Sequence, residues 1–212
     1  MSDKTENFSF TSFWKSNSPT RNVFFAILIG YIIASIISIA RGGVGNFLDI
    51  FVISEDTLAI IGQSNDMVYN GHIYQLVTSV FVHVHILHFL SNCLFLFIFG
   101  LRAEERIIDS HYYIIFLISG ILGSLLTLSF GPGTLSAGAS GGIFGLLGVD
   151  LVLAYEETKR RSLWSYLGAG AIFLILSGGL NVNFLAHSIG FISGVLLPLF
   201  VFKKRKQRET EN

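Results

Sequence analysis

The sequence predicts an all-α membrane protein, a bundle of six transmembrane helices with a large first extramembrane loop. Of its 212 residues, 51% are hydrophobic and 13% are charged, and long uncharged runs separate the charged clusters. This composition is typical of a chain whose apolar segments face lipid. The near-zero net charge gives no electrostatic basis for binding nucleic acid. The single cysteine, Cys93, excludes an internal disulfide.

The chain divides into a polar N-terminal tail (1–22), a six-span domain (23–202) and a basic C-terminal tail (203–212). Each predicted span is an apolar run near the length of about 20 residues that crosses a bilayer. The six predicted spans are residues 23–40, 75–101, 112–130, 140–155, 163–180 and 184–202. The stretch 41–74 mixes polar residues with short apolar pieces, and we expect a long loop with short interfacial helices. The first twenty residues lack the order of a signal peptide, so the first apolar run is expected to remain as a span.

The positive charges predict the orientation of the chain. With the N-terminus in the cytoplasm, nearly every Lys and Arg between the spans falls on the cytoplasmic side, and only Arg41 lies outside. Because cytoplasmic loops are enriched in Lys and Arg, both termini are predicted to be cytoplasmic. The second, fourth and sixth spans then run from outside to inside.

The fourth span begins at a serine, Ser140, and carries the small residues Gly141, Gly145 and Gly148 at helical spacing. A stripe of small residues lets another helix approach closely. The run 140–155 is roughly 24 Å long as a helix, against a hydrocarbon core of about 30 Å, so its start is expected below the outer surface. The preceding link is expected to be irregular, which at that depth requires burial in protein or a water-filled cavity.

The sixth span begins with a histidine, His187, followed by Gly190 and Gly194 on the same face as Ala186. We expect this face to pack against the glycines of the fourth span, Gly141 and Gly145, which would bring His187 to Ser140. A serine hydroxyl is a weak nucleophile until a base takes its proton, and imidazole suits that role near neutral pH. The pattern therefore predicts a catalytic dyad of Ser140 and His187. The alternatives are a serine N-cap and a histidine that donates to a neighbouring carbonyl.

Two donors lie one helical turn apart in the second span, His88 and Asn92. Together with the Ser140 backbone N–H, they are predicted to stabilise an oxyanion. The alternative is that they only form hydrogen bonds between helices. His83 is expected to pack or to orient a loop, and His85 is expected to face elsewhere.

Two other assignments fail on the sequence, and a third, a metal site, is disfavoured. Gly138-Ala-Ser-Gly-Gly142 matches the G-x-S-x-G elbow, but the strand and soluble sheet that this motif requires are not predicted. Asp150 lies about 15 Å along the helix from Ser140, so it cannot orient His187, and we expect a dyad without an acid. Since an aspartate within a span costs about 2.5–3.5 kcal/mol, we expect Asp150 to be protonated or hydrogen-bonded in the bundle. The run from His83 to His88 lacks the H-E-x-x-H pattern, and neither a metal nor a cofactor is predicted.

In combination, these residues resemble the rhomboid family of intramembrane serine proteases from about Gly71 to Gly194. The resemblance is carried by three motifs on the even-numbered spans: His88-x-x-x-Asn92, Gly138-Ala-Ser140-Gly141 and Ala186-His187-x-x-Gly190-x-x-x-Gly194. It implies that Ser140 is the nucleophile, His187 the general base, and His88 and Asn92 the oxyanion donors.

Other positions match or depart from the family pattern. Gly100-Leu-Arg-Ala-Glu104 with Arg106 resembles a structural stretch that ends the second span in the family. Tyr74-Gln75 stands where the family usually carries an aromatic–Arg pair, which puts the usual contacts of the first loop in doubt. Phe144 stands where some relatives carry a tyrosine that packs on the base, so the ring is kept without its hydroxyl.

The resemblance implies a serine endopeptidase that hydrolyses peptide bonds through an acyl-enzyme. Its substrates would be single-span membrane proteins cut near the outer membrane boundary, and access is expected between the second and fifth spans. The implied partners are transmembrane substrates and membrane lipid. The implied location is the cell membrane, and the compact form favours a prokaryotic plasma membrane.

Three alternative functions remain open. A non-catalytic rhomboid-like protein that binds membrane helices is disfavoured because Ser140 and His187 are both present. A small-solute transporter is disfavoured because the sequence lacks an internal repeat. A metal enzyme using His83, His85 and His88 is disfavoured because the first two would point to different faces of a helix.

Overall fold

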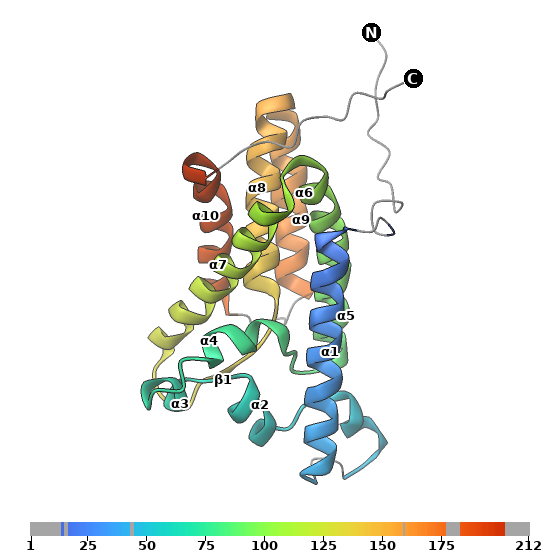
Figure 1. Cartoon of the computed structure of the whole chain (residues 1–212), viewed down its shortest axis with the longest axis vertical. Coiled ribbons are helices and arrows are strands. Elements are labelled where there is room, and N and C mark those ends of the chain that lie inside the picture. Colours follow the sequence, from blue (N-terminus) through green and yellow to red (C-terminus); the bar gives the residue numbers. More distant parts are fainter. Residues whose placement is uncertain (1–13, 15–16, 43–44, 159, 177–182, 202–212) are drawn as a thin grey trace.

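The computed structural model describes residues 14, 17–42, 45–158, 160–176 and 183–201. It is mostly helical, with long helices side by side and several short elements gathered at one end of the bundle (Figure 1). The long helices are α1 (Pro19–Ala40), α7 (Asp109–Thr127), α8 (Ser140–Thr158), α9 (Arg160–Leu176) and α10 (Phe184–Val201), with α5 (Ile86–Phe95) continuing into α6 (Leu101–Arg106). The predicted C-terminal tail and most of the N-terminal tail lie outside the described residues.

Three helical segments of the described chain are long and apolar enough to cross a membrane. They are Pro19–Ala40, Ile86–Arg106 and Asp109–Phe130. Three shorter apolar helices accompany them, at Ser140–Tyr155, Trp164–Leu176 and Phe184–Leu199. The chain is therefore a membrane protein, while the count of six spans and the cytoplasmic termini stay predictions. Part of the predicted fifth span, 177–180, lies outside the described residues.

The predicted start of the second span is wrong. Residues 75–81 form two short elements, α4 (Gln75–Thr78) and η3 (Ser79–Phe81), and α5 begins only at Ile86. Between them the chain is extended, and the Val84 carbonyl accepts a hydrogen bond from the Ile53 N–H at 2.8 Å. Apolar content predicts burial but does not distinguish a helix from a buried loop, so the run was assigned too long. A π-helical turn, η4 (Leu96–Gly100), joins α5 to α6.

The segment between α1 and α5 folds into short elements that hold the end of α7. These are η2 (Phe47–Phe51), α2 (Glu55–Ile61), β1 (Gln63–Ser64) and α3 (Asn65–Tyr69). Strand β1 pairs antiparallel with β2 (Leu135–Ser136) in the link before α8, with Gln63 opposite Ser136. That link was expected to be irregular throughout, but part of it is this strand.

Side chains of this segment donate to carbonyls at the end of α7 and around its continuation η5 (Leu128–Phe130), where helix ends leave carbonyls to be satisfied. The Gln63 side-chain amide donates to the Ser124 carbonyl at 2.9 Å. The Asn65 side-chain amide donates to the carbonyls of Thr127 at 3.0 Å and Gly131 at 2.8 Å. The segment is thereby fixed to α7 beside the link that leads to Ser140.

Gln75 holds the same segment together from within. Its side chain is fully buried; its Oε1 accepts from the Ser64 N–H at 2.9 Å and its Nε2 donates to the carbonyls of Ala59 and Ile60 at 2.7 and 3.2 Å. These bonds satisfy three backbone groups at the junction of α2 and β1. Gln75 stands where the family usually carries the Arg of an aromatic–Arg pair, and here its hydrogen bonds act as an internal clamp of the loop.

Helix α8 packs against both α7 and α10, which also contact each other, and glycines allow the contacts of α8. A Cβ on Gly190 would collide with the carbonyl oxygen of Gly141, and a Cβ on Gly194 would collide with that of Gly145. Toward α7, a Cβ on Gly142 would lie 2.6 Å from the Phe116 carbonyl oxygen. Because only hydrogen atoms fit at these crossings, the backbones of α8 and α10 approach at van der Waals distance.

Asp150, for which the sequence offered no confident partner, forms ion pairs with α6. It is fully buried, with its Oδ1 3.0 Å from Arg106 Nη1 and its Oδ2 3.6 Å from Arg102 Nε. The Arg102 guanidinium also lies 5.3 Å from the ring centroid of Tyr166 on α9. These contacts join α6, α8 and α9.

Helix α6 is also tied to the beginning of α1. The buried Glu104 carboxylate accepts from the Ser18 hydroxyl at 2.8 Å and from the Thr20 N–H at 3.1 Å. Ser18 is the N-cap of α1, which begins at Pro19 rather than at residue 23. The stretch from Gly100 to Arg106 therefore has a structural role in joining three helices.

Candidate active site

Ser140 is the first residue of α8 and follows a turn that requires glycine. Gly138 has φ +143°, a backbone conformation that other residues rarely adopt. A Cβ at this position would also lie 2.8 Å from Cε1 of His88. The turn therefore lets the His88 ring lie close to the backbone that precedes the Ser140 hydroxyl.

Residues before α5 hold this turn in place. The Gly138 N–H donates to the Ser79 carbonyl at 2.9 Å. The Ala139 N–H points to Nε2 of the fully buried His83 at 3.5 Å, a long hydrogen bond. His83, predicted to pack or to orient a loop, contacts the loop that leads to Ser140.

His187 lies in the first turn of α10, and Asn183 forms the cap of that turn. The Asn183 Oδ1 accepts from the Ala186 N–H at 3.0 Å, and its backbone carbonyl accepts from the His187 N–H at 3.2 Å. The Asn183 side chain also donates to the Thr127 hydroxyl on α7. The sequence analysis did not single out Asn183, although an Asn before an apolar helical run is a known N-cap signal.

The two helix starts bring Ser140 and His187 into contact. Nε2 of His187 lies 2.7 Å from Oγ of Ser140, which is hydrogen-bonding distance. The side chains come from residues 47 positions apart and are 7% and 6% exposed. The crossing of α8 and α10 at Gly141 and Gly190 lies immediately beside this pair.

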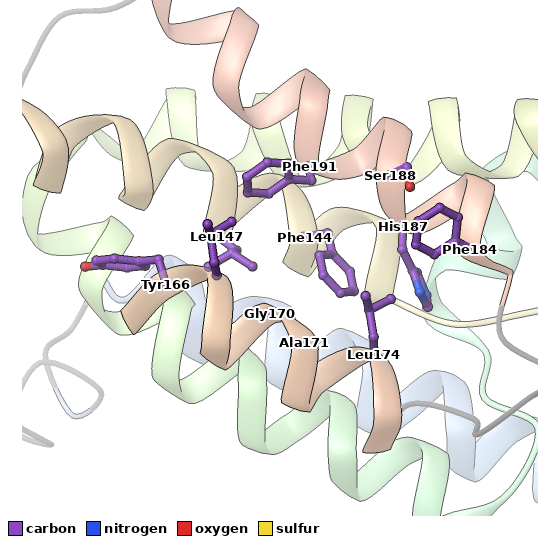
Figure 2. Close-up of a pocket in the computed structure, with 11 residues that line it drawn as sticks. Phe144, Leu147, Tyr166, Gly170, Ala171, Leu174, Phe184, His187, Ser188 and Phe191 are labelled. Atoms are coloured by element: carbon purple, nitrogen blue, oxygen red, sulfur yellow. The ribbon is translucent and has the colours of Figure 1, made fainter. Parts of the chain in front are cut away.

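An aromatic stack supports the imidazole on one side. The Phe144 ring of α8 lies parallel to the His187 ring, with centroids 4.8 Å apart and planes inclined by 26°. Phe173 of α9 stacks on Phe144 at 4.7 Å. Figure 2 shows Phe144 and His187 in an apolar pocket between α8, α9 and α10, with Leu174 and Phe184 beside them. This packing restricts rotation of the imidazole away from Ser140.

A second, more polar cavity lies on the other side of the pair. Its lining includes the hydroxyls of Ser79, Ser124, Thr127 and Ser136, and the side chains of Asn183, His85, His88, Ser140 and His187. Polar side chains that converge on an open space of this kind can hold water. The cavity lies beside the link before α8, and a water-filled cavity is one of the two surroundings predicted for that link.

The two expected oxyanion donors lie in different surroundings. His88 lines the polar cavity with Ser140 and His187. Asn92, one turn further along α5, is fully buried, and its side-chain Nδ2 donates to the His88 carbonyl at 2.8 Å. The amide nitrogen carries two hydrogens, so this bond leaves one of them for another acceptor.

The expectation that His85 faces elsewhere is wrong. His85 lines the same polar cavity, and it is the N-cap of α5, with Nδ1 accepting from the His88 N–H at 3.1 Å. The expectation assumed that residues 83–88 form one helix. Because the chain is extended up to His85, the spacing of side chains on a helix does not apply there.

Comparison with known proteins identifies the family. A family model described as the Rhomboid domain matches residues 70–204. The chain is 31% identical over 159 residues to Rhomboid-like protease 3 of Toxoplasma gondii, an alignment that covers 71% of this chain and 60% of that protein. It is 34% identical to RHOMBOID-like protein 1 of Arabidopsis thaliana over 66% of this chain and 37% of that protein.

A bacterial relative is covered more completely. The chain is 30% identical to the putative rhomboid protease YdcA of Bacillus subtilis over 144 residues, which is 66% of this chain and 72% of that protein. The alignments cover 60% and 37% of the first two relatives, so the chain matches only part of their length. The matched region includes all the residues of the candidate site, and the chain belongs to the rhomboid family.

Proposed function

We propose that this protein is an intramembrane serine endopeptidase that uses Ser140 as its nucleophile and His187 as its general base. The observation that carries the proposal is the 2.7 Å separation of Ser140 Oγ and His187 Nε2 beside a polar cavity. Nucleophile and base within hydrogen-bond reach are the usual signature of covalent hydrolysis. Two of the compared relatives, from Toxoplasma gondii and Bacillus subtilis, are named proteases, which supports the same activity.

The reaction follows from this geometry. His187 Nε2 takes the proton of Ser140 as Oγ attacks the scissile carbonyl carbon, forming a tetrahedral intermediate with a negatively charged oxygen. The intermediate collapses when the peptide C–N bond breaks, and the leaving amine takes the proton from His187. The resulting acyl-Ser140 ester is hydrolysed by a water from the polar cavity, with His187 as the base again.

The oxyanion needs hydrogen-bond donors in the place where the negative charge develops. We assign this role to the Ser140 N–H at the start of α8, to His88 and to Asn92. The Ser140 N–H is one of the free donors at a helix N-terminus, where the helix dipole also favours negative charge. His88 is supported by its position in the cavity. Asn92 lies one helical turn from His88, and one hydrogen of its amide remains available after its bond to the His88 carbonyl.

The proposed substrates are single-span membrane proteins cut near the outer membrane boundary. The predicted orientation, with both termini in the cytoplasm, puts the start of α8 in the outer half of the bilayer. An amide within a substrate helix is shielded by its neighbours, so substrates with helix-destabilising residues are expected to react faster. No metal or cofactor takes part in the proposed steps.

A labelling experiment tests the assignment. The purified protein in detergent is treated with a fluorophosphonate probe, and cleavage of a transmembrane model substrate is measured in parallel. We expect one labelled residue, Ser140, with labelling and cleavage lost in Ser140→Ala and His187→Ala. Ser35→Ala is the matched control, because Ser35 bonds the Tyr31 carbonyl of its own helix α1 and does not line the polar cavity.

Two results would contradict the proposal. Cleavage that persists in Ser140→Ala would assign the chemistry to another residue. Capture of transmembrane helices by a wild-type protein that neither reacts with the probe nor cleaves would favour the non-catalytic alternative.

A further inference from the structure

His85 lies in the polar cavity but has no part in the dyad or the oxyanion donors. We propose that His85 is a substrate-binding residue whose Nε2–H donates a hydrogen bond to a main-chain carbonyl of the substrate next to the scissile bond. This inference rests on the proposed protease function and adds a residue that positions the substrate.

The hydrogen bond at the start of α5 determines which ring nitrogen of His85 carries the proton. Nδ1 accepts from the His88 N–H at 3.1 Å, so it uses its lone pair and carries no hydrogen. In a neutral imidazole the proton then lies on Nε2. His85 therefore offers one N–H donor at the end of the ring away from the helix.

Both ends of the residue are held in place. The backbone of His85 forms an antiparallel bridge with Val52, and the adjacent Val84 carbonyl accepts from the Ile53 N–H at 2.8 Å. The side chain is held by the bond to His88, whose ring centroid is 5.9 Å from that of His85. A donor that is already ordered loses little entropy when a ligand binds, so it contributes more to affinity.

The environment of His85 suits a carbonyl of an unwound peptide. His85 is partly exposed and shares the cavity with His88, Ser140 and His187. A substrate helix must open locally before its amide can be attacked, and opening leaves main-chain carbonyls without their helical partners. Such carbonyls are costly within a membrane unless a donor reaches them. The Nε2–H of His85 provides that donor beside the nucleophile.

Two substitutions separate the contact with substrate from the cap. Asn is a strong N-cap, so His85→Asn keeps an acceptor for the His88 N–H, but its side chain ends short of the Nε2 position. His85→Ala removes the cap and the donor together. The measurements are thermal stability, kcat and KM for a transmembrane model substrate in detergent, and labelling of Ser140 by a small fluorophosphonate.

We expect His85→Asn to keep the wild-type melting temperature and labelling rate while kcat/KM falls about 5–15-fold, mainly through KM. His85→Ala should show the same kinetic loss and a lower melting temperature. Wild-type kinetics in His85→Asn would overturn this inference and leave the protease assignment intact. Slower labelling in His85→Asn would also overturn it, because His85 would then act on the dyad. A wild-type protein that neither labels nor cleaves would instead overturn the proposed function, and this inference with it.

Discussion

Helix α8 carries two buried polar sites that differ in how their groups are paired. At its start, Ser140 contacts the imidazole of His187 and faces a polar cavity. Ten residues later, the fully buried Asp150 contacts two guanidinium groups, those of Arg106 and Arg102. Both sites place polar atoms inside an apolar bundle, which costs free energy unless partners or water compensate.

The difference teaches which buried polar groups remain available for chemistry. A carboxylate that contacts two arginines is stabilised in its ionised form and in one position. Such a group suits a contact between helices. A hydroxyl–imidazole pair is neutral and can move its proton, and the adjacent cavity can supply water. We therefore expect substitutions at the first site to change catalysis and substitutions at the second to change stability.

The largest effect is expected from removing the proposed nucleophile or the proposed base. Ser140→Ala and His187→Ala should each lower kcat/KM by about 10⁴-fold or more, because neither group acts without the other. Their melting temperatures should stay close to that of the wild type, since each change removes few packed atoms. Cleavage assays and thermal unfolding in the same detergent test both statements. A Ser140→Ala protein that unfolds many degrees earlier would show that the two sites of α8 do not differ as described.

The next largest effect is expected at the ion-pair site. Asp150→Ala should reduce the free energy of unfolding by about 3–5 kcal/mol, because it removes the carboxylate from buried or partly buried arginines. Fluorophosphonate labelling of the protein that remains folded should be unchanged. The double variant Asp150→Asn with Arg106→Gln should be more stable than Asp150→Asn alone, and additive losses would argue against direct coupling of the pair.

The proposed oxyanion donors should give a smaller, purely kinetic effect. His88→Ala should lower kcat by about 10²–10³-fold with little change in KM, because the donor acts only on the developing charge. Leu90→Ala is the matched control on the same helix, since Leu90 is 51% exposed. A change in KM alone would assign His88 to substrate binding, together with His85.

The smallest effect is expected from the cap of α10. Asn183→Ala should cost about 0.5–2 kcal/mol of stability, because it removes the acceptor for the Ala186 N–H and the bond to Thr127. Asn183→Asp keeps an acceptor at the cap and should recover most of the stability. Cleavage should fall several-fold in Asn183→Ala, because the first turn of α10 positions His187. Wild-type cleavage by an unstable Asn183→Ala protein would limit Asn183 to a structural role.

Parts of the fold followed from local sequence patterns. Apolar runs located α7, α8 and α10 to within a few residues. The small residues of the fourth and sixth predicted spans indicated where two backbones meet, and the crossings at Gly141–Gly190 and Gly145–Gly194 occur at those positions. Apolar composition and glycine spacing can be read within a single segment. They indicate that the segment is buried and that it can approach another helix closely.

Other features depended on contacts between distant segments. The start of α5 at Ile86 depends on residues 52–53, which bind the extended chain at Val84 and His85. The orientation of His85 into the cavity follows from that extended backbone, and a periodic pattern does not reveal it. The hydrogen bonds of Gln75 join α2 to β1. The residues next to Gln75 in the sequence do not indicate them either.

The sequence by itself determined that the protein is a membrane protein. It also determined which polar residues lie at the starts of the helices that carry small residues on one face. Apolar length and side-chain chemistry are local properties, and lipid selects for them segment by segment. The tertiary structure alone decided which arginines hold Asp150 and how close Ser140 Oγ and His187 Nε2 lie. These are relations between atoms that are tens of residues apart, and they exist only when the helices are packed together.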